Sequence, residues 1–332
     1  MSRFKEDEIV PDNEGGTQPA NDGIDRRNFL GCMAWAGTGL LWTLAGGIPT
    51  SKLLAQAVKT GSAQARKVED FSFVQISDSH IGFNRGANPD VTGTLAKAIS
   101  RTAIVPAGMK SPDFMIHTGD ITQNSKASEF DTAAQVIKSF KKETFYVPGE
   151  HDFIDDGEQY KQRFGKGTLG NGWYSYNHKG VHFVGLNNCV QVDAMGNLGA
   201  EQLAWLKSDL AGLSSSTPIV VFAHIPLWMV YEKWGWGTAD GARALALLKR
   251  FGSVTVLNGH IHQVVQKVEG NVAFHTAMST AFPQPAPGTA PNPGPMVVPA
   301  GKLHSVLGVT AVKVVRGHSH LAVVDHTLAE TA

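Results

Sequence analysis

The chain has 332 residues, of which 42% are hydrophobic, and its 29 lysines and arginines balance 29 aspartates and glutamates. This composition supplies a sizeable core and excludes a wholly disordered chain, and the zero net charge argues against a protein that binds a nucleic-acid duplex by bulk positive charge. Two cysteines are too few for a disulfide scaffold or a cysteine-based zinc module. All 13 histidines lie at or after residue 80, which directs attention to metal ligands and acid–base groups in the body of the chain.

Residues 1–65 are predicted to form a disordered start and an export signal. Arg26 and Arg27 precede an uncharged, moderately apolar run, and Ala55-Gln56-Ala57 after it is a suitable cleavage site. The paired arginines resemble the twin-arginine signal, which carries folded proteins across the membrane. This resemblance implies the twin-arginine export machinery as a partner and a periplasmic or other extracytoplasmic location. The alternative is a retained segment that anchors the protein to the membrane.

From residue 66 to residue 332 the pattern predicts a single α/β domain. Short apolar runs that end in polar clusters indicate buried strands at 71–76, 114–116, 144–147, 181–186, 219–223 and 254–257. Helical patterns lie between them at 130–140, 201–213 and 241–251. A proline-rich loop at 283–299 is followed by two strands, 309–315 and 321–328, that are predicted to pair. Alternating strands and helices favour a sheet that binds its ligand at the carboxyl ends of the strands.

Polar side chains follow five of the predicted strands, at the point where each strand ends. They are Asp78 and His80; Asp120; Glu150, His151 and Asp152; His224; and His260 and His262. Because strand ends expose polar groups in one crevice of such a sheet, we expect these side chains to meet. Aspartate and histidine together suit zinc, manganese or iron. Without His151 and Asp152, seven candidate ligands remain, which are too many for one tetrahedral ion and fit two ions that share a bridging carboxylate.

These residues, in this order and with a glycine directly before Asp120, Glu150 and His260, resemble the motifs of the calcineurin-like metallophosphoesterases. The match spans roughly residues 71–280. The resemblance implies a four-layer α/β sandwich of two mixed β-sheets flanked by helices. It also implies two metal ions, divalent or of mixed valence (Mn, Fe or Zn). The first would be held by Asp78, His80, Asp120 and His262, and the second by Asp120, the residue at position 150, His224 and His260.

The same resemblance implies a metal-dependent phosphoesterase in which a hydroxide held between the two metals attacks phosphorus. His151 would protonate the leaving oxygen, and Asp152 would orient His151. The segment 259–280 resembles the bacterial branch related to cyclic-nucleotide phosphodiesterases, which favours a small phosphodiester, such as a nucleotide, as the substrate. A phosphomonoester, a pyrophosphate and a phosphoprotein remain alternatives. A catalytically weak metal-binding scaffold of the same fold is a further alternative.

Two positions set this chain apart from parts of that family. The family usually has asparagine where this chain has Glu150, so the chain carries an extra negative charge and an extra methylene there. We hypothesise that Glu150 ligates the second metal. Its charge would then lower the Lewis acidity of that ion and repel an anionic phosphate, or would instead favour a more highly charged ion such as Fe(III). The alternative leaves Glu150 turned away and water as the ligand. The purple acid phosphatases place a ligating tyrosine three residues after the bridging aspartate. This chain has Gln123 there, so membership of that subgroup is not expected.

Three further features have both a structural and a functional interpretation. His117 lies inside a predicted strand and is expected to be a buried core histidine. The segment 317–320 imitates the Gly-His-x-His motif but lies between two predicted strands, so a surface turn is expected. Four aromatic residues follow His224, namely Trp228, Tyr231, Trp234 and Trp236. They predict either a wall that stacks on a flat group of the substrate or the packing of a loop on the core.

Overall fold

The computed structural model describes residues 40–45, 48–53, 68–103, 110–189, 195–318 and 320–329. The chain divides into two compact units, Met1–Ala57 and Val58–Ala332. In the first unit, β1 (Leu40–Ala45) and β2 (Ile48–Leu53) pair as an antiparallel hairpin within the predicted export segment. The arginine pair and the predicted cleavage site lie outside the described residues. Among the residues that are described, no helix has the length and apolar character needed to cross a membrane.

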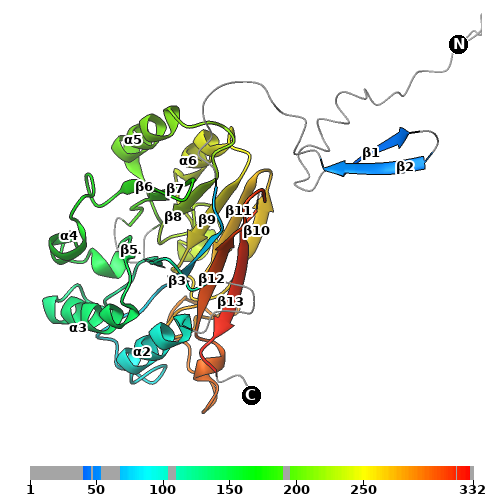
Figure 1. The fold of residues 1–332 in the computed structure, drawn as a ribbon. Helices are drawn as coiled ribbons and strands as arrows, with labels where there is room; N and C mark the ends of the chain where they lie inside the picture. The colour runs from blue at the N-terminus through cyan, green and yellow to red at the C-terminus, as the bar shows by residue number, and fades with distance from the viewer. Residues whose placement is uncertain are drawn as a thin grey trace, which may run out of the picture. The chain divides into compact units, whose positions relative to one another are not determined.

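The second unit is built on two mixed β-sheets (Figure 1). The six-stranded sheet has the order β10 (Gln266–Glu269), β11 (Val272–Thr276), β9 (Val254–Asn258), β8 (Ile219–Phe222), β7 (Val181–Gly185) and β6 (Tyr174–His178). Its four inner strands are parallel, and the two outer strands are antiparallel to their neighbours. The five-stranded sheet has the order β13 (Ala322–Thr327), β12 (Gly308–Val314), β3 (Phe71–Ile76), β4 (Met115–His117) and β5 (Thr144–Tyr146). Strands β3, β4 and β5 are parallel, and β12 is antiparallel to both of its neighbours.

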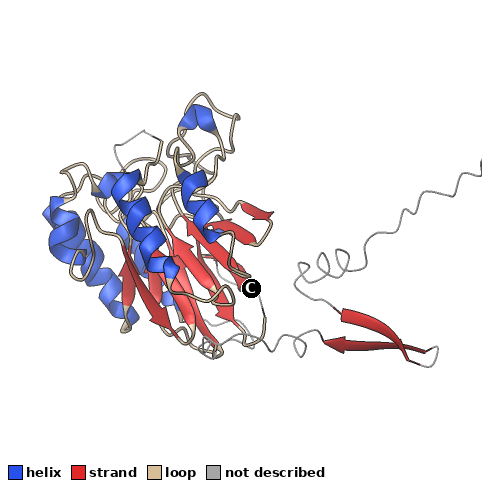
Figure 2. Ribbon diagram, turned by 90° about the horizontal axis from the view of Figure 1, so that it is seen from above, coloured by secondary structure: helices blue, strands red, loops and turns tan. Residues whose placement is uncertain are grey.

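Helices cover the outer faces of the two sheets, and Figure 2 shows the strands gathered between them. Helices α2 (Val91–Thr102), α3 (Ala127–Ile137) and α4 (Glu158–Phe164) share an apolar core with the five-stranded sheet. Helices α5 (Gly199–Ala211) and α6 (Gly241–Leu248) share a second core with the six-stranded sheet. A third core, rich in phenylalanine, joins the facing surfaces of the two sheets. These three cores define the four-layer sandwich that the sequence resemblance implies.

The central strands form because their residues are apolar on both faces. Strand β8 has the sequence Ile-Val-Val-Phe and all four residues are buried, as expected for a parallel strand between two layers. The predicted strands and helices are confirmed with ends that shift by a few residues, and β12 and β13 pair as predicted. Helices α2 and α4 and strands β6, β10 and β11 were not predicted. All four residues of β10 are exposed, so that strand carries no apolar pattern.

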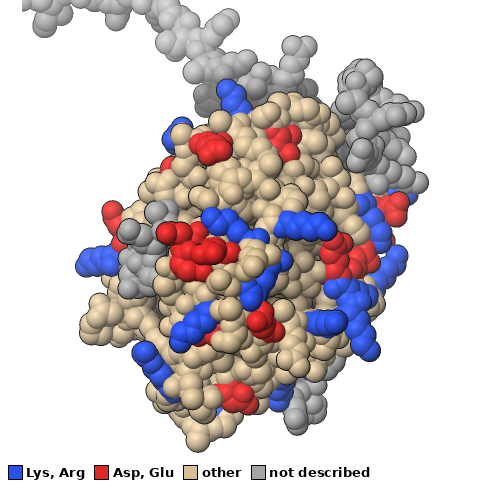
Figure 3. All heavy atoms as spheres, turned by 90° about the vertical axis from the view of Figure 1, so that its left-hand side faces the viewer, with Lys and Arg blue, Asp and Glu red and all other residues tan. Residues whose placement is uncertain are grey.

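The surface charge follows the balanced composition. On the face that carries α3 and α4, Figure 3 shows lysines and arginines interspersed with aspartates and glutamates. A broad basic surface, which is the usual footprint of a nucleic-acid duplex, does not occupy this face. The candidate functional residues lie instead in a local site at the strand ends.

Candidate metal centre

Both sheets contribute to one cluster of polar side chains. The five-stranded sheet supplies Asp78 and His80 after β3, Asp120 after β4, and Glu150 in the single helical turn (Glu150–Asp152) that follows β5. The six-stranded sheet supplies His224 after β8, and His260 and His262 after β9. All seven side chains are buried, and the structure brings all of them together. The strand ends of the two sheets therefore meet at one site, as the sequence predicts.

The backbone around the site is strained. Five residues of the cluster have positive φ angles between 42° and 69°, namely Asp78, His80, Asp120, His260 and His262. Such conformations cost side-chain-bearing residues on the order of 1 kcal/mol or more each and gather at functional sites. The neighbouring glycines allow close contact between the loops. A Cβ on Gly119, whose φ is 93°, would lie 2.6 Å from His224 Nδ1, and one on Gly149 would overlap the carboxylate of Asp120.

Asp78, His80 and His262 form the first group of candidate ligands. His262 Nε2 lies 3.3 Å from Asp78 Oδ1 and 3.2 Å from His80 Nε2. The other ring nitrogen of His262 donates to the backbone oxygen of Phe282 at 2.6 Å. This hydrogen bond leaves Nε2 as the nitrogen that faces the site, which is how proteins commonly orient a metal-ligating histidine.

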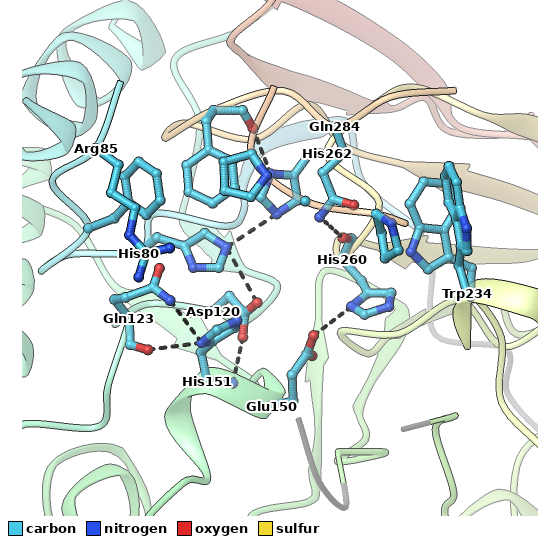
Figure 4. Close-up of a pocket in the computed structure, with 16 residues that line it drawn as sticks. His80, Arg85, Asp120, Gln123, Glu150, His151, Trp234, His260, His262 and Gln284 are labelled. Atoms are coloured by element: carbon cyan, nitrogen blue, oxygen red, sulfur yellow. Dashed lines mark hydrogen bonds and ion pairs between the residues drawn. The ribbon is translucent and has the colours of Figure 1, made fainter. Parts of the chain in front are cut away.

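Glu150, His224 and His260 form the second group. The two oxygens of Glu150 face the two histidines separately, each at 2.9 Å: Oε1 faces His260 Nδ1 and Oε2 faces His224 Nε2. His224 Nδ1 donates to the backbone oxygen of Thr118 at 2.7 Å, so its Nε2 is again the free nitrogen. The side chain of Glu150 therefore points into the site, and the alternative in which it turns away is not the conformation observed (Figure 4).

Asp120 lies between the two groups. Its Oδ2 is 3.5 Å from His80 Nε2 of the first group and 3.3 Å from His224 Nε2 of the second. Its Oδ1 accepts a hydrogen bond of 3.0 Å from the backbone N–H of His151. This position is the one that a carboxylate bridging two ions has to occupy.

The geometry fits metal ions. Ligand distances of about 2.1 Å place neighbouring ligand atoms about 3 Å apart, and the separations in both groups are of that size. His224 Nε2, His260 Nδ1 and Glu150 Oε2 are buried and make no hydrogen bond of good geometry. Buried polar atoms without such partners are rare unless an ion or water satisfies them. The carboxylate and imidazole donors thus form a site for two metal ions, consistent with zinc, manganese or iron.

The charges of the cluster shift its pKa values strongly. Burial raises the pKa of Asp78, but the charges of His262, His224 and His80 more than offset it and hold the pKa below its usual range. Burial also raises the pKa of Glu150, and the neighbouring His260 and His224 hold it well below its usual range. Burial lowers the pKa of His80 to about 3, so this ring is neutral and able to ligate a metal.

His151 lies beside the two groups, and its ring is 4.9 Å from that of His80, centre to centre. Its Nδ1 donates to the backbone oxygen of Gln123 at 2.9 Å, so Nε2 is the nitrogen left for a ligand in the cavity. Burial lowers the pKa of His151, but the negative charges of Asp120 and Glu150 outweigh burial and leave the pKa raised. The ring is therefore biased towards the protonated form, which a general acid requires.

Asp152 makes its hydrogen bonds to groups other than the ring of His151. Its carboxylate accepts hydrogen bonds from the backbone N–H groups of Gly149, Ile121 and Thr122, at 2.9–3.0 Å, and from the hydroxyl of Thr122. These bonds hold the loops after β4 and β5 together. The ring of His151 is oriented by Gln123 instead. Asp152 therefore supports the site through these loops, and its negative charge is one of several that raise the pKa of His151.

A cavity of about 240 Å³ opens above the two groups (Figure 4). His151, Gln123 and Arg85 line one side, and Trp234 and Trp236 line another. Pro293, Gly294 and Pro295 of the proline-rich loop complete the wall.

The four aromatic residues after His224 have different surroundings. Trp234 and Trp236 line the cavity and pack edge to face at 4.9 Å, and Tyr231 packs on Trp234. Trp228 instead packs on Phe274 in the core beneath the six-stranded sheet. Trp228 therefore packs on the core, whereas Trp234 and Trp236 lie where a wall next to a substrate would have to be.

The expectations for His117 and for the turn at 317–320 are met. His117 is fully buried, accepts a hydrogen bond from the N–H of Gly119, and pairs with Ser79 Oγ at 2.8 Å. Burial lowers its pKa to about 3, as expected for a neutral core histidine. His318 and His320 lie exposed in the turn between β12 and β13, so they do not form a buried pair of metal ligands.

Sequence reasoning missed several residues of the site. Arg85 and Phe83 line the cavity although no motif marks them, and the Arg85 guanidinium lies 6.0 Å from the Phe83 ring centre. Gln284 lines it as well and donates to the backbone oxygen of His260 at 3.2 Å. In the sequence, Gln123 indicated only that the ligating tyrosine of the purple acid phosphatases is absent. The one available signal was its position three residues after Asp120, next to a candidate metal ligand.

Comparison with known proteins agrees with this geometry. The calcineurin-like phosphoesterase model matches residues 71–264, which is more than half of the chain. A probable glycerophosphodiester phosphodiesterase of Arcobacter nitrofigilis is 26% identical over 218 residues, covering 62% of this chain and 77% of the relative. A 3',5'-cyclic adenosine monophosphate phosphodiesterase of Vibrio vulnificus is 23% identical over 234 residues, covering 66% of this chain and 80% of the relative.

Among solved structures, a dimetal phosphatase from Danio rerio has the same fold. It aligns with a TM-score of 0.53 at 14% identity and covers 78% of this chain and 99% of its own. At this identity the similarity concerns the architecture of two sheets and their flanking helices. The family model, the phosphodiesterase relatives and the two groups of metal ligands agree with one another. The chain belongs to the calcineurin-like phosphoesterase family and is a hydrolase that acts on phosphate ester bonds.

Proposed function

We propose that the chain hydrolyses a small phosphodiester at a dinuclear metal centre and that it does so outside the cytoplasm. The observation that carries the proposed hydrolysis is the position of His151. Its free Nε2 belongs to a ring that lines the cavity beside both groups of metal ligands, and its pKa is raised. A proton donor placed next to a dinuclear site is what cleavage of an ester with a poor leaving group requires.

The proposed roles follow from the two groups. Asp78, His80, Asp120 and His262 hold the first ion, and Asp120, Glu150, His224 and His260 hold the second. When bound, the ions supply positive charge for the phosphate oxygens and lower the pKa of a water molecule so that it attacks phosphorus. As the bond between phosphorus and the leaving oxygen breaks, His151 gives that oxygen its proton. Gln123 keeps the ring in position through the hydrogen bond to Nδ1.

A diester is favoured over a monoester for two reasons. Relatives that match this chain over about three quarters of their length are named as phosphodiesterases. In addition, the cavity extends on both sides of the metal groups, towards Arg85 and towards Trp234, so it has room for a substituent on each side of phosphorus (Figure 4). The aromatic side suits a flat or apolar substituent.

The test compares two chromogenic esters, bis(p-nitrophenyl) phosphate and p-nitrophenyl phosphate. Metal would be removed with a chelator, and kcat/KM would be measured before and after reloading with Mn²⁺. We expect no cleavage by the stripped chain and a higher kcat/KM for the diester after reloading. A higher kcat/KM for the monoester would assign the chain to the phosphomonoesterases. Two bound ions with no cleavage of either ester would point to a metal-binding scaffold instead.

Export is supported by the sequence alone, through Arg26 and Arg27 and the apolar run that follows. Replacing both arginines by lysine keeps the charge and removes the paired guanidinium groups. In a bacterium that carries the twin-arginine machinery, we expect cell fractionation to find the wild-type chain in the periplasm and the double variant in the cytoplasm. Arg3→Lys is the matched control and should leave export unchanged. Periplasmic recovery of the double variant would contradict twin-arginine export.

A further inference from the structure

Glu150 puts a full negative charge at the wall of the cavity where the reacting phosphate has to lie. The side chain lines the cavity and is 7% exposed. Its two oxygens are held 2.9 Å from His224 Nε2 and 2.9 Å from His260 Nδ1, so the charge has a fixed place in the second ligand group. It is not free to swing away when a substrate enters.

The charge balance of the centre depends on this residue. Three carboxylates, those of Asp78, Asp120 and Glu150, belong to the two ligand groups. Two divalent ions would leave such a centre with about one net positive charge, and with none once the attacking hydroxide is bound. A phosphodiester adds a single negative charge to that centre. A phosphomonoester carries nearly two at neutral pH and would leave an excess of negative charge in a buried place.

Apart from His151, which lines the cavity as the proposed proton donor, the cavity holds little positive charge to offset this balance. Among the described residues that line it, Arg85 is the only lysine or arginine. Figure 4 shows Arg85 on the opposite side of the cavity from Trp234, and no ion pair joins it to Glu150. Arg85 is exposed, so water screens its charge more than it screens the buried carboxylate.

We propose that Glu150 selects substrates by their charge. It makes the site accept phosphate groups with one negative charge and reject dianionic phosphate groups. The inference rests on the proposed function, because it assigns the preference for diesters over monoesters to a single side chain. A neutral amide at position 150 would leave the centre more positive and would admit a dianion. The chain would thus be a phosphodiesterase with weak phosphomonoesterase activity, and the carboxylate of Glu150 would be the cause of that weakness.

The kinetic test uses two variants of the full chain. Glu150→Gln removes the charge and keeps the size of the side chain, whereas Glu150→Asp keeps the charge. With saturating Mn²⁺ and the metal content measured, kcat/KM is compared for bis(p-nitrophenyl) phosphate and p-nitrophenyl phosphate. We expect the diester-to-monoester ratio to fall at least about tenfold in Glu150→Gln, as one nearby charge would cause at an intermediate dielectric. It should change little in Glu150→Asp. An unchanged ratio in Glu150→Gln with two ions bound would overturn the inference.

A binding measurement separates this inference from the proposed function. Calorimetry on the Mn-loaded chain compares inorganic phosphate, which is largely dianionic at pH 8, with dimethyl phosphate. The wild-type chain should bind dimethyl phosphate at least as tightly as phosphate, and Glu150→Gln should reverse that order. Tighter binding of phosphate by the wild-type chain would refute the inference, even where Glu150→Gln fails to retain both ions. A chain with the expected binding order that cleaves neither ester would refute the proposed function and support the inference.

Discussion

The two ring nitrogens of His151 have separate tasks. Nδ1 is committed to the backbone oxygen of Gln123, which leaves Nε2 for the substrate. General acids of this kind contribute about 10²- to 10⁴-fold to a rate, and they matter most when the leaving group is a poor one. We therefore expect His151→Ala to lower kcat by that factor for a diester with an alkyl alcohol as its leaving group. For a nitrophenolate leaving group, which departs without a proton, the loss should be small.

The comparison would be made by steady-state kinetics on the two substrates with the Mn-loaded chain. His318→Ala is the control, because that histidine lies exposed in the turn after β12. An equal loss on both substrates would mean that His151 acts by shaping the site and does not donate the proton.

The contacts of Asp152 show why its hydrogen-bond partners could not be predicted from its neighbours in the chain. His151 and Asp152 are neighbours in the chain, so the motif suggested that one orients the other. In the single turn that carries them, the carboxylate instead points to the N–H groups of Ile121 and Thr122, about thirty residues earlier. That proximity depends on the pairing of β4 with β5, which a local motif does not reveal. The seven candidate metal ligands, by contrast, could be chosen from residue type and order alone.

At the scale of elements, the segment between β8 and α6 forms the aromatic wall of the cavity. Trp234 is half-buried and lines the cavity, and Trp236 is buried behind it. A stacked ring contributes about 0.5–1.5 kcal/mol beyond its burial, or about two- to tenfold in kcat/KM. We expect Trp234→Ala to lower kcat/KM by that factor for diesters with a ring next to the phosphate and to leave ring-free diesters unaffected.

Trp234→Phe retains a ring and serves as the matched control, with the circular dichroism spectrum of each variant as the check on folding. Unchanged kcat/KM of a folded Trp234→Ala variant on every diester would show that this wall only covers the core.

A partly buried hydrogen-bond network joins α5 to β6 and β7 of the six-stranded sheet. Asp209 of α5 accepts hydrogen bonds from His182 Nε2 of β7 at 2.8 Å and from Ser175 Oγ of β6 at 2.6 Å. Burial raises the pKa of Asp209, but these two hydrogen bonds more than offset it, so the pKa is lower in the folded chain than its ordinary value of 3.8. The ionised carboxylate therefore stabilises the fold above that value, and this stabilisation is lost as the pH falls through the folded pKa.

Asp209→Asn should accordingly lower the free energy of unfolding by about 1 kcal/mol at pH 7. The difference from the wild-type chain should shrink and disappear as the pH falls below the folded pKa of Asp209. Denaturant unfolding at a series of pH values measures it. Glu201→Gln, on the exposed surface of the same helix, is the control. A difference that persists at low pH would show that the variant acts through packing and not through the charge.

Strands whose residues are buried on both faces could be predicted from the sequence, whereas a partly exposed strand and a helix of weak propensity could not. Strands β7, β8 and β9 are uniformly buried and could be found as apolar runs. Strand β6, Tyr174–His178, has mostly half-buried residues and looks polar in the sequence. Helix α2 contains a glycine and three threonines, and it is held by its buried face and by the Asp90 side chain, which accepts from Gly93 N–H at 2.8 Å. Its stability comes from tertiary packing, which overrides weak helix propensity.

At the scale of the whole second unit, the centre exists because two sheets are packed face to face. The five-stranded sheet carries Asp78, His80, Asp120 and Glu150, and the six-stranded sheet carries His224, His260 and His262. Neither sheet alone holds a complete group, since His262 completes the first and Glu150 completes the second. The phenylalanine-rich core between the sheets therefore sets the distances within the metal centre. From the sequence, this pairing of distant strands followed only from the resemblance to a known family.

The most direct test of the account is diester turnover as a function of bound metal. The stripped chain would be titrated with Mn²⁺, with metal content determined by mass spectrometry and cleavage of bis(p-nitrophenyl) phosphate followed at each point. The account predicts no turnover without metal and a rise that ends at two ions per chain. Turnover by the stripped chain would contradict it, and so would a chain with two bound ions that does not cleave the diester.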